Sequence, residues 1–160
     1  MIWRTSSTGS ADTERLGELL GSRLGGGEVI ELRSDLGGGK TTFVRGLAKG
    51  AGSQARVSSP TFTLSRIYQA KGLQIHHFDF YRLTDPGILA SQLAEAVQDQ
   101  NVVVVEWADI VKDVLADDRL TIEFKPTASS PDERDINFYY PENLLPLIAY
   151  LETNYNEVKS

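Results

Sequence analysis

The chain has 160 residues, of which 41% are apolar and 24% charged, with a formal net charge of −6 at pH 7 and no cysteine. This composition is typical of one globular domain, residues 1–160, that buries about two-thirds of its extended surface. It excludes disulfides and thiolate metal sites, and no apolar run is long enough to span a membrane. Because the first residues also lack a signal-peptide pattern, we expect a cytoplasmic protein.

The charge is distributed unevenly along the chain. Residues 33–82 carry eight basic and two acidic side chains, a local charge of +6, whereas the remainder carries −12. A positive region suits a polyphosphate ligand or an acidic partner surface, although these side chains could equally be solvated residues of one helix and one strand. The overall acidity argues against tight direct binding of nucleic acid.

The first predicted element is a helix that begins at Ser10, which is expected to be its N-cap. Four leucines at helical spacing predict its buried stripe: Leu16, Leu19, Leu20 and Leu24. The triplet Gly25-Gly26-Gly27 is expected to form the C-cap and a turn, since no Lys-Thr follows it as a phosphate loop would require.

The most informative motif is the stretch Ser-Asp-Leu-Gly-Gly-Gly-Lys-Thr-Thr at residues 34–42, which follows a predicted strand at 29–32. In a P-loop, backbone N–H groups and the start of the next helix bind phosphate, the lysine reaches the terminal phosphates and the first hydroxyl binds Mg²⁺. The full pattern has glycine where this chain has Ser34, and a flexible turn is the alternative. The predicted nucleotide-binding residues are Asp35, Leu36, Gly37, Gly38, Gly39, Lys40, Thr41 and Thr42.

The segments after this motif predict a helix, a hairpin and a second helix. The apolar face after Lys40 predicts a helix closed by Gly50 and Gly52. The strands of the predicted hairpin are Phe62–Tyr68 and Leu73–Phe78. Asp85 and Pro86 are expected to be the cap and first residue of a helix. Its buried side is predicted to be Leu89, Leu93 and Val97.

The last third of the chain predicts three strands and a helix, at 101–105, 119–125, 134–140 and from Pro141 onward. The core residues expected in this last helix are Leu144, Leu147, Ile148 and Leu151. Together the elements predict an α/β fold of the P-loop NTPase type. This fold is a three-layer sandwich in which a central, mostly parallel sheet with some antiparallel strands has helices on both faces.

Two carboxylates follow predicted strands. Glu106 directly follows the run Val102–Val105, an arrangement typical of a Walker B element, so we expect it near Mg²⁺; a solvated strand-end acid is the alternative. Asp79 shares one strand face with His77 and Tyr81 if the segment stays extended, where it could hold the metal or orient a water molecule.

Three other features have competing interpretations. His76 and His77 point to opposite faces of a strand and cannot share a metal ion, so a structural role for His77 is preferred over zinc binding. Trp107 is interpreted as core or site wall rather than as a base-stacking residue. A loop at residues 58–62 is either a simple turn or a switch that senses the γ-phosphate. The switch residues would be Ser59, Pro60, Thr61 and Phe62.

In order and spacing these segments resemble the TsaE (formerly YjeE) family, bacterial ATPases needed to make threonylcarbamoyladenosine (t6A) in tRNA. The matching stretches, within about residues 30–110, are Asp35–Phe43 with Arg45-Gly46, Ser59-Pro60-Thr61-Phe62, His77-x-Asp79-x-Tyr81-Arg82-Leu83 and Glu106-Trp107. A P-loop alone is common to many families, whereas the combination with the other stretches is specific.

The resemblance implies ATP and Mg²⁺ as cofactors, weak ATPase activity, and work with TsaD and TsaB partners through which the chain would meet tRNA only indirectly. It implies Lys40, Asp79 and Glu106 as catalytic residues, with Thr41, Glu106 and Asp79 serving the metal. The family usually has glycine at position 34 and alanine at 38. Gly38 is expected to cost only loop entropy, whereas Ser34 would matter if its position required a positive φ.

Two other functions use the same motif. A small-molecule kinase would need an acceptor pocket and a lid with arginines, and Arg134 is the only arginine in a late loop region. A nucleotide-sensing module would bind nucleotide without turnover. The sequence leaves the adenine contacts, the oligomeric state and the partner surface open.

Overall fold

The computed structural model describes residues 1–35, 37–60, 62–98 and 100–159. Within these ranges the strands are β1 (Ile2–Ser7), β2 (Val29–Arg33), β3 (Ser65–Gln69), β4 (Gln74–Asp79), β5 (Val102–Glu106), β6 (Leu120–Pro126) and β7 (Arg134–Tyr139). The helices are α1 (Ser10–Gly21), α2 (Lys40–Gly50), α3 (Gly87–Gln98) and α4 (Leu145–Lys159), with 3-10 turns η1 (Ala108–Val111) and η2 (Glu142–Leu144).

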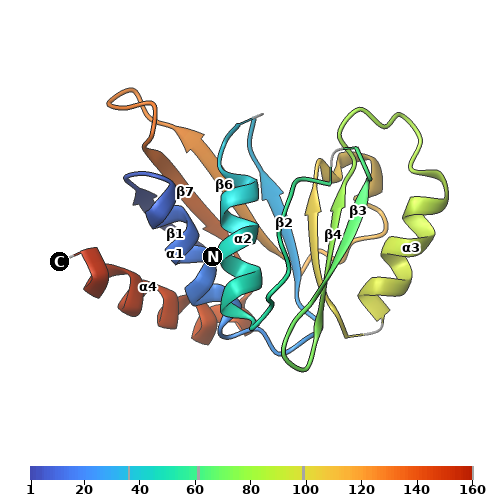
Figure 1. The fold of residues 1–160 in the computed structure, drawn as a ribbon, viewed down its shortest axis with the longest axis horizontal. Helices are drawn as coiled ribbons and strands as arrows, with labels where there is room; N and C mark the ends of the chain where they lie inside the picture. The colour runs from blue at the N-terminus through green and yellow to red at the C-terminus, as the bar shows by residue number, and fades with distance from the viewer. Residues whose placement is uncertain (36, 61, 99, 160) are drawn as a thin grey trace.

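All of these strands belong to one sheet with the order β1-β7-β6-β2-β5-β4-β3 (Figure 1). The central strands β6, β2, β5 and β4 are parallel, and β7, β1 and β3 add antiparallel pairs at the two sides. The five residues of β5 are all buried, as expected for a strand covered on both faces. The predicted α/β fold and the predicted hairpin, β3–β4, are confirmed.

Helices cover both faces of the sheet. One hydrophobic cluster joins residues of all seven described strands to α1, α2 and α4, and a second, on the other face, joins β4 and β5 to α3 and η1. Figure 1 shows α3 beside β4, apart from the other helices. No helix in the described part of the chain is long and apolar enough to cross a membrane.

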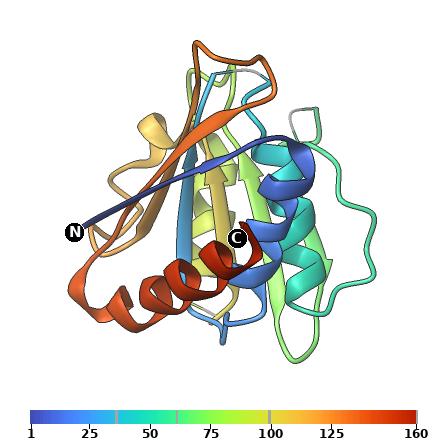
Figure 2. The same ribbon diagram turned by 90° about the vertical axis from the view of Figure 1, so that its left-hand side faces the viewer.

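Helices α1 and α2 lie against each other (Figure 2), and they pack closely because glycines line both sides of their contact. These glycines are Gly17 and Gly21 on α1 and Gly46 and Gly50 on α2. A Cβ on any of them would overlap a backbone carbonyl oxygen of the facing helix. This contact fixes α2, and with it the start of α2 at the carboxyl edge of β2.

The sequence patterns do not predict β1. Its residues pair with β7, more than 130 positions away, from Ile2 opposite Tyr139 to Ser7 opposite Arg134. The ring of Trp3 lies 4.8 Å from that of Phe138 across this pairing. A short polar segment becomes a strand here because a distant edge is available, which local patterns do not reveal.

The predicted ends of α1 are wrong. Gly9 is the N-cap and Ser10 is the first helical residue; the cap contacts instead come from Thr8, whose N–H and hydroxyl donate to Asp12 at 3.0 and 2.7 Å. At the other end, Ser22 is the C-cap, and its N–H donates to a carbonyl of the last turn. The glycine triplet at 25–27 therefore forms only the turn that leads to β2.

Other boundaries differ by a few residues. Strand β3 begins at Ser65 rather than at Phe62, whose side chain is exposed. Helix α3 begins at Gly87 because the Asp85 carboxylate accepts the Gly87 N–H at 2.9 Å in a turn before the helix. On α3, Ala96 is buried rather than Val97, which is only partly buried.

The last helix also begins later than predicted. Pro141 is the N-cap of η2, and α4 follows from Leu145. Of the predicted core residues, Ile148 and Leu151 are buried, whereas Leu144 and Leu147 only pack against the cluster from its edge. Tyr155, which the apolar spacing misses, is buried and donates its hydroxyl to the carbonyl of Ser6 at 2.9 Å.

Candidate functional site

The glycine loop, residues 34–39, joins β2 to α2 at the carboxyl edge of the parallel strands. Gly37 and Gly39 have φ of 76° and 101°, in the left-handed region that other residues rarely adopt. Gly39 is the N-cap of α2 and has no side chain to cap the helix. The first N–H groups and the positive end of the α2 dipole are therefore directed toward the space beside the loop.

That space is a cavity of about 240 Å³. It brings together residues from four separate parts of the sequence. Its lining residues are Gly37, Gly38, Gly39, Lys40, Thr41, Thr42, Ser59, Asp79, Glu106 and Trp107. Leu36 and Thr61, also predicted for the site, lie outside the described residues, and the side chain of Phe62 is 95% exposed, away from the cavity lining.

Lys40 and Glu106 form the charged centre of the cavity. The Lys40 ammonium donates to the backbone carbonyl of Ser34 at 3.1 Å and lies 3.8 Å from Glu106 Oε1. The other carboxylate oxygen, Oε2, lies 2.9 Å from Nε2 of His77. His77 is fully buried behind Glu106, so it orients this carboxylate rather than contacting a ligand.

Asp79 is the last residue of β4, and in the sheet it lies directly opposite Glu106. The chain turns after Asp79, where the carboxylate accepts the N–H of Tyr81 at 2.8 Å and Arg82 has a φ of 67°. Phe80 is buried in the second hydrophobic cluster. The strand therefore ends at Asp79, with its carboxylate on the cavity.

Trp107 is a wall of the cavity. It has φ 55° and ψ 52°, an uncommon backbone conformation for a bulky residue, which turns the chain directly after Glu106. The Lys40 ammonium lies 4.7 Å from the centre of its ring, and the Tyr81 ring lies 4.9 Å away. The indole thus covers the Lys40 ammonium on one side.

Thr41, Asp79 and Glu106 carry oxygen donors that could hold a magnesium ion. A hydroxyl and two carboxylates are hard oxygen donors of the kind that Mg²⁺ prefers, and all three residues line the same cavity. Mg²⁺ commonly uses one or two protein carboxylates together with phosphate oxygens and water.

Arg134, the first residue of β7, lies over the outer side of the glycine loop. Its guanidinium donates to the carbonyls of Gly38 and Gly37 at 3.3 and 3.4 Å. A smaller cavity of about 170 Å³ adjoins the loop there. Its lining residues are Gly9, Ser10, Thr13, Gly37, Gly39, Thr42, Asp132 and Arg134.

Apart from the glycine loop and Thr42 on α2, the residues of this smaller cavity come from the first 13 residues of the chain and from residues 132–134. Gly9 and Thr13 belong to the start of α1, and Asp132 belongs to the loop before β7. Local patterns in the sequence do not reveal Gly9, Thr13 or Asp132 as site residues, because no motif spacing links the first residues of the chain to residues near 132. The packing of α1 against α2 and the pairing of β1 with β7 together bring them to the glycine loop.

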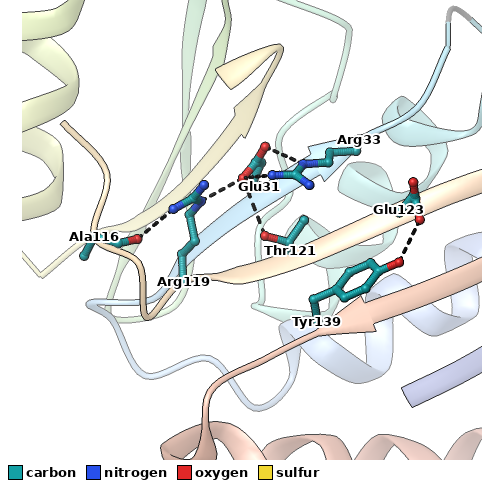
Figure 3. Close-up of polar contacts among 7 residues, drawn as sticks. All are labelled: Glu31, Arg33, Ala116, Arg119, Thr121, Glu123 and Tyr139. Carbon is teal, nitrogen blue, oxygen red and sulfur yellow. Dashed lines mark hydrogen bonds and ion pairs between the residues drawn. The ribbon is translucent and has the colours of Figure 1, made fainter. Parts of the chain in front are cut away.

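A third cavity, of about 340 Å³, lies on the other side of Lys40 and Trp107 and includes Asp35. Its lining also includes the buried carboxylate Glu31, which lies on the sheet face opposite that of Glu106. Figure 3 shows the polar contacts of Glu31. Glu31 accepts from Nε of Arg33 and Nε of Arg119, both at 2.7 Å. Burial raises the pKa of Glu31, but the hydrogen bonds from Arg33 and Arg119 outweigh it and hold this pKa below its ordinary value.

Fold and site together define a class of protein: an α/β protein in which a glycine-rich loop joins a parallel strand to a helix beside two buried carboxylates. The model of the family described as "Threonylcarbamoyl adenosine biosynthesis protein TsaE" matches residues 7–136. The chain belongs to the TsaE family.

Individual relatives agree with this assignment. The tRNA threonylcarbamoyladenosine biosynthesis protein TsaE of Bacillus subtilis (strain 168) is 38% identical over 136 residues, covering 85% of this chain and 83% of that protein. The protein of the same name from Treponema pallidum is 37% identical over 131 residues, covering 81% and 96%. The crystal structure of Bacillus subtilis YdiB superposes with a TM-score of 0.79 at 30% identity, covering 96% of this chain and 95% of that one.

Proposed function

We propose that this chain is a Mg²⁺-dependent ATPase of low turnover that supports t6A modification of tRNA. The observation that carries the proposal is that Lys40, Thr41, Asp79 and Glu106 line one cavity at the start of α2. A lysine, a hydroxyl and carboxylates beside a glycine loop are the groups that phosphoryl transfer from ATP requires.

Each residue has a role that follows from its position. The backbone N–H groups of the glycine loop and the start of α2 would bind the β-phosphate, and Lys40 would reach the γ-phosphate. Mg²⁺, held by Thr41 and Glu106 with help from Asp79, would neutralise charge on the phosphates. Asp79, at the end of the neighbouring strand, would also orient the attacking water.

The smaller cavity is the proposed place for the nucleoside. It shares Gly37, Gly39 and Thr42 with the phosphate cavity but does not include Glu106, so a nucleotide whose terminal phosphates lie near the metal could extend into it. Ser10 and Thr13 line it, with the Thr13 methyl group toward Gly39 and the Thr13 hydroxyl bonded to Ser7, and Arg134 also belongs to its lining. Ser59, which lines the phosphate cavity, is the switch-loop residue positioned to respond to the γ-phosphate.

We further propose that this cytoplasmic chain works with TsaD and TsaB homologues and reaches tRNA only through them. The names of the relatives refer to t6A biosynthesis. The net charge of −6 disfavours direct tRNA binding, whereas the positive region at residues 33–82 suits nucleotide and an acidic partner surface.

The direct test is nucleotide binding by calorimetry with Lys40→Ala and a matched control. Lys49 is a second lysine on α2, but its side chain is 63% exposed and pairs with Glu18 at 3.5 Å. We expect Lys40→Ala to weaken ATP affinity by about 10-fold or more, since it removes a charged phosphate contact, and Lys49→Ala to leave it unchanged. Equal effects of the two variants would contradict the proposed site.

Turnover assays separate the proposed function from the two alternatives. Phosphate release without any acceptor, rising when TsaD and TsaB homologues are added, supports an ATPase. Phosphate transfer only in the presence of a small-molecule acceptor would indicate a kinase. Binding without hydrolysis, even with both partners present, would indicate a nucleotide-sensing module.

A further inference from the structure

Ser34, at the first position of the glycine loop, has contacts with both ends of the loop. Its hydroxyl donates to the carbonyl oxygen of Asp35 at 2.8 Å, and the N–H of Gly38 donates to the same oxygen at 3.2 Å. Its own backbone carbonyl accepts the Lys40 ammonium at 3.1 Å. One residue therefore contacts the start of the loop, its turn and the lysine.

Gly38 faces this serine, and the space between them holds only one side chain. A Cβ built on Gly38 would overlap the Ser34 hydroxyl oxygen and would lie 2.7 Å from the Ser34 Cβ. Rotation about χ1 can move the hydroxyl away but cannot move the Cβ. A separation of 2.7 Å is closer than carbon atoms approach without repulsion, so the backbone would have to shift.

The three glycines of the loop are needed for different reasons. Gly37 and Gly39 have positive φ and no atom within 3.4 Å of a built Cβ, so their backbone conformation disfavours a side chain. Gly38 does not have a positive φ, and the main obstacle there is the Ser34 side chain, with the carbonyl oxygen of Asp35 as a second, less severe contact at 3.1 Å. The expectation that Gly38 matters only through loop entropy is therefore wrong. Ser34 does not have a positive φ either, so its position does not require glycine.

We propose that Ser34 and Gly38 form one packing unit, in which the Ser34 side chain fills the space that a side chain at position 38 would need. Ser34 is therefore a positioning residue for the loop. The serine holds the Asp35 carbonyl and the Lys40 ammonium in place, and a second side chain at 38 displaces both. The expected loss of nucleotide affinity rests on the proposed ATP site. The steric relation between Ser34 and Gly38 does not depend on that site.

The test is a set of alanine and glycine variants measured for ADP affinity and for melting temperature without nucleotide. Gly38→Ala overpacks the loop, and we expect ADP affinity to fall by roughly 10-fold or more. Ser34→Gly removes one neutral hydrogen bond and is expected to cost about 5-fold or less. The double variant Ser34→Gly/Gly38→Ala again places one side chain in the space, and we expect affinity within about 3-fold of the parent.

A second double variant grades the rescue. Ser34→Ala/Gly38→Ala removes the overlapping hydroxyl but keeps the Ser34 Cβ position occupied, so its affinity should fall between those of Gly38→Ala and Ser34→Gly/Gly38→Ala. Gly25→Ala is the matched control, because its built Cβ has no neighbour closer than 3.9 Å and it lies outside the site. This control should leave ADP affinity unchanged.

Two outcomes would overturn the proposal. One is an ADP affinity of Gly38→Ala equal to that of the parent, and the other is a double variant Ser34→Gly/Gly38→Ala that is no better than Gly38→Ala alone. The melting temperatures keep the test separate from the proposed function. If the parent binds no ADP, the proposed ATP site is wrong. A melting temperature that falls in Gly38→Ala and is restored in Ser34→Gly/Gly38→Ala would still support the packing unit. A double variant that melts no higher than Gly38→Ala would reject it.

Discussion

Glu31 and Glu106 are two buried carboxylates on adjacent parallel strands, and only one of them lies at the candidate site. Each side chain is 3% exposed. They lie one register position apart on β2 and β5 and point to opposite faces of the sheet. Burial alone therefore does not distinguish them.

The difference lies in their partners. Glu31 is hydrogen-bonded by two arginines at 2.7 Å, and the hydroxyl of Thr121 adds a contact at 3.5 Å (Figure 3). Glu106 has one close partner, the ring of His77, while Lys40 stays at 3.8 Å across a cavity. A buried carboxylate whose charge is fully compensated by arginines is structural, whereas one that faces a cavity beside a lysine retains the capacity to bind a metal.

The largest effect is expected from Glu106→Gln, which removes the charge of the carboxylate with little change in shape. Because this substitution removes a proposed Mg²⁺ ligand, the increase in ADP affinity that Mg²⁺ produces should fall by about 10-fold or more. Calorimetric titrations with and without Mg²⁺ measure this. Unchanged Mg²⁺ dependence would place the metal elsewhere.

Glu31→Gln should have the opposite effect: it should lower the stability of the fold and leave ADP affinity nearly unchanged. It leaves Arg119, whose side chain is 14% exposed, without its anionic partner, and we expect a loss of about 2–4 kcal/mol in the free energy of unfolding. ADP affinity should stay within about 2-fold of the parent, since additivity holds for sites without shared partners. Urea unfolding and calorimetry test the two halves of this prediction, and a stable variant with weakened ADP binding would reverse the assignment.

Replacing either arginine should cost less stability than Glu31→Gln, and the more buried arginine should matter more. Arg33 is 53% exposed, so solvent screens its pair with Glu31, and Arg33→Ala should cost about 1 kcal/mol or less. Arg119→Ala should cost about 1–3 kcal/mol, because it removes the more buried guanidinium and its hydrogen bond to the carbonyl of Ala116. Urea midpoints of the two variants give the ranking, and equal costs would show that exposure does not govern this cluster.

The smallest expected effect is the pH dependence of the contribution that Glu31 makes to the free energy of unfolding. A carboxyl whose pKa is lower in the folded state stabilises the protein fully above its unfolded pKa, about 4.3, and loses this contribution as pH falls through the folded pKa. The stability difference between the parent and Glu31→Gln should therefore be constant from pH 7 to about pH 5 and shrink below about pH 4.5. A difference that grows on acidification would contradict the direction of the pKa shift.

Glu106 and Glu31 also differ in how well the sequence alone predicts their roles. The site carboxylate, Glu106, follows a run of four valines that is recognisable locally, and the glycine loop lies between a strand and a helix that are also recognisable. Glu31 appears in the sequence only as one polar residue in a strand. Its partner Arg119 is 88 positions away, and β6 must pair with β2 before the two meet.

Long-range pairing also accounts for the other features that local patterns missed. Strand β1 exists because β7 offers an edge, and that pairing brings the start of α1 to the glycine loop. Arg134 looks like a loop arginine in the sequence, yet the start of β7 aims it at the carbonyls of Gly37 and Gly38. The relation between Ser34 and Gly38 depends on the shape of a turn, which residue spacing does not encode.

The proposed site requires that Glu106, and not the equally buried Glu31, serves ATP hydrolysis. ATP turnover of Glu106→Gln and Glu31→Gln tests this, measured with Mg²⁺ and TsaD and TsaB homologues at a temperature where both variants are folded. We expect turnover to fall by about 100-fold or more for Glu106→Gln and to stay within about 2-fold of the parent for Glu31→Gln. Turnover retained by Glu106→Gln, or lost equally in both variants, would contradict it.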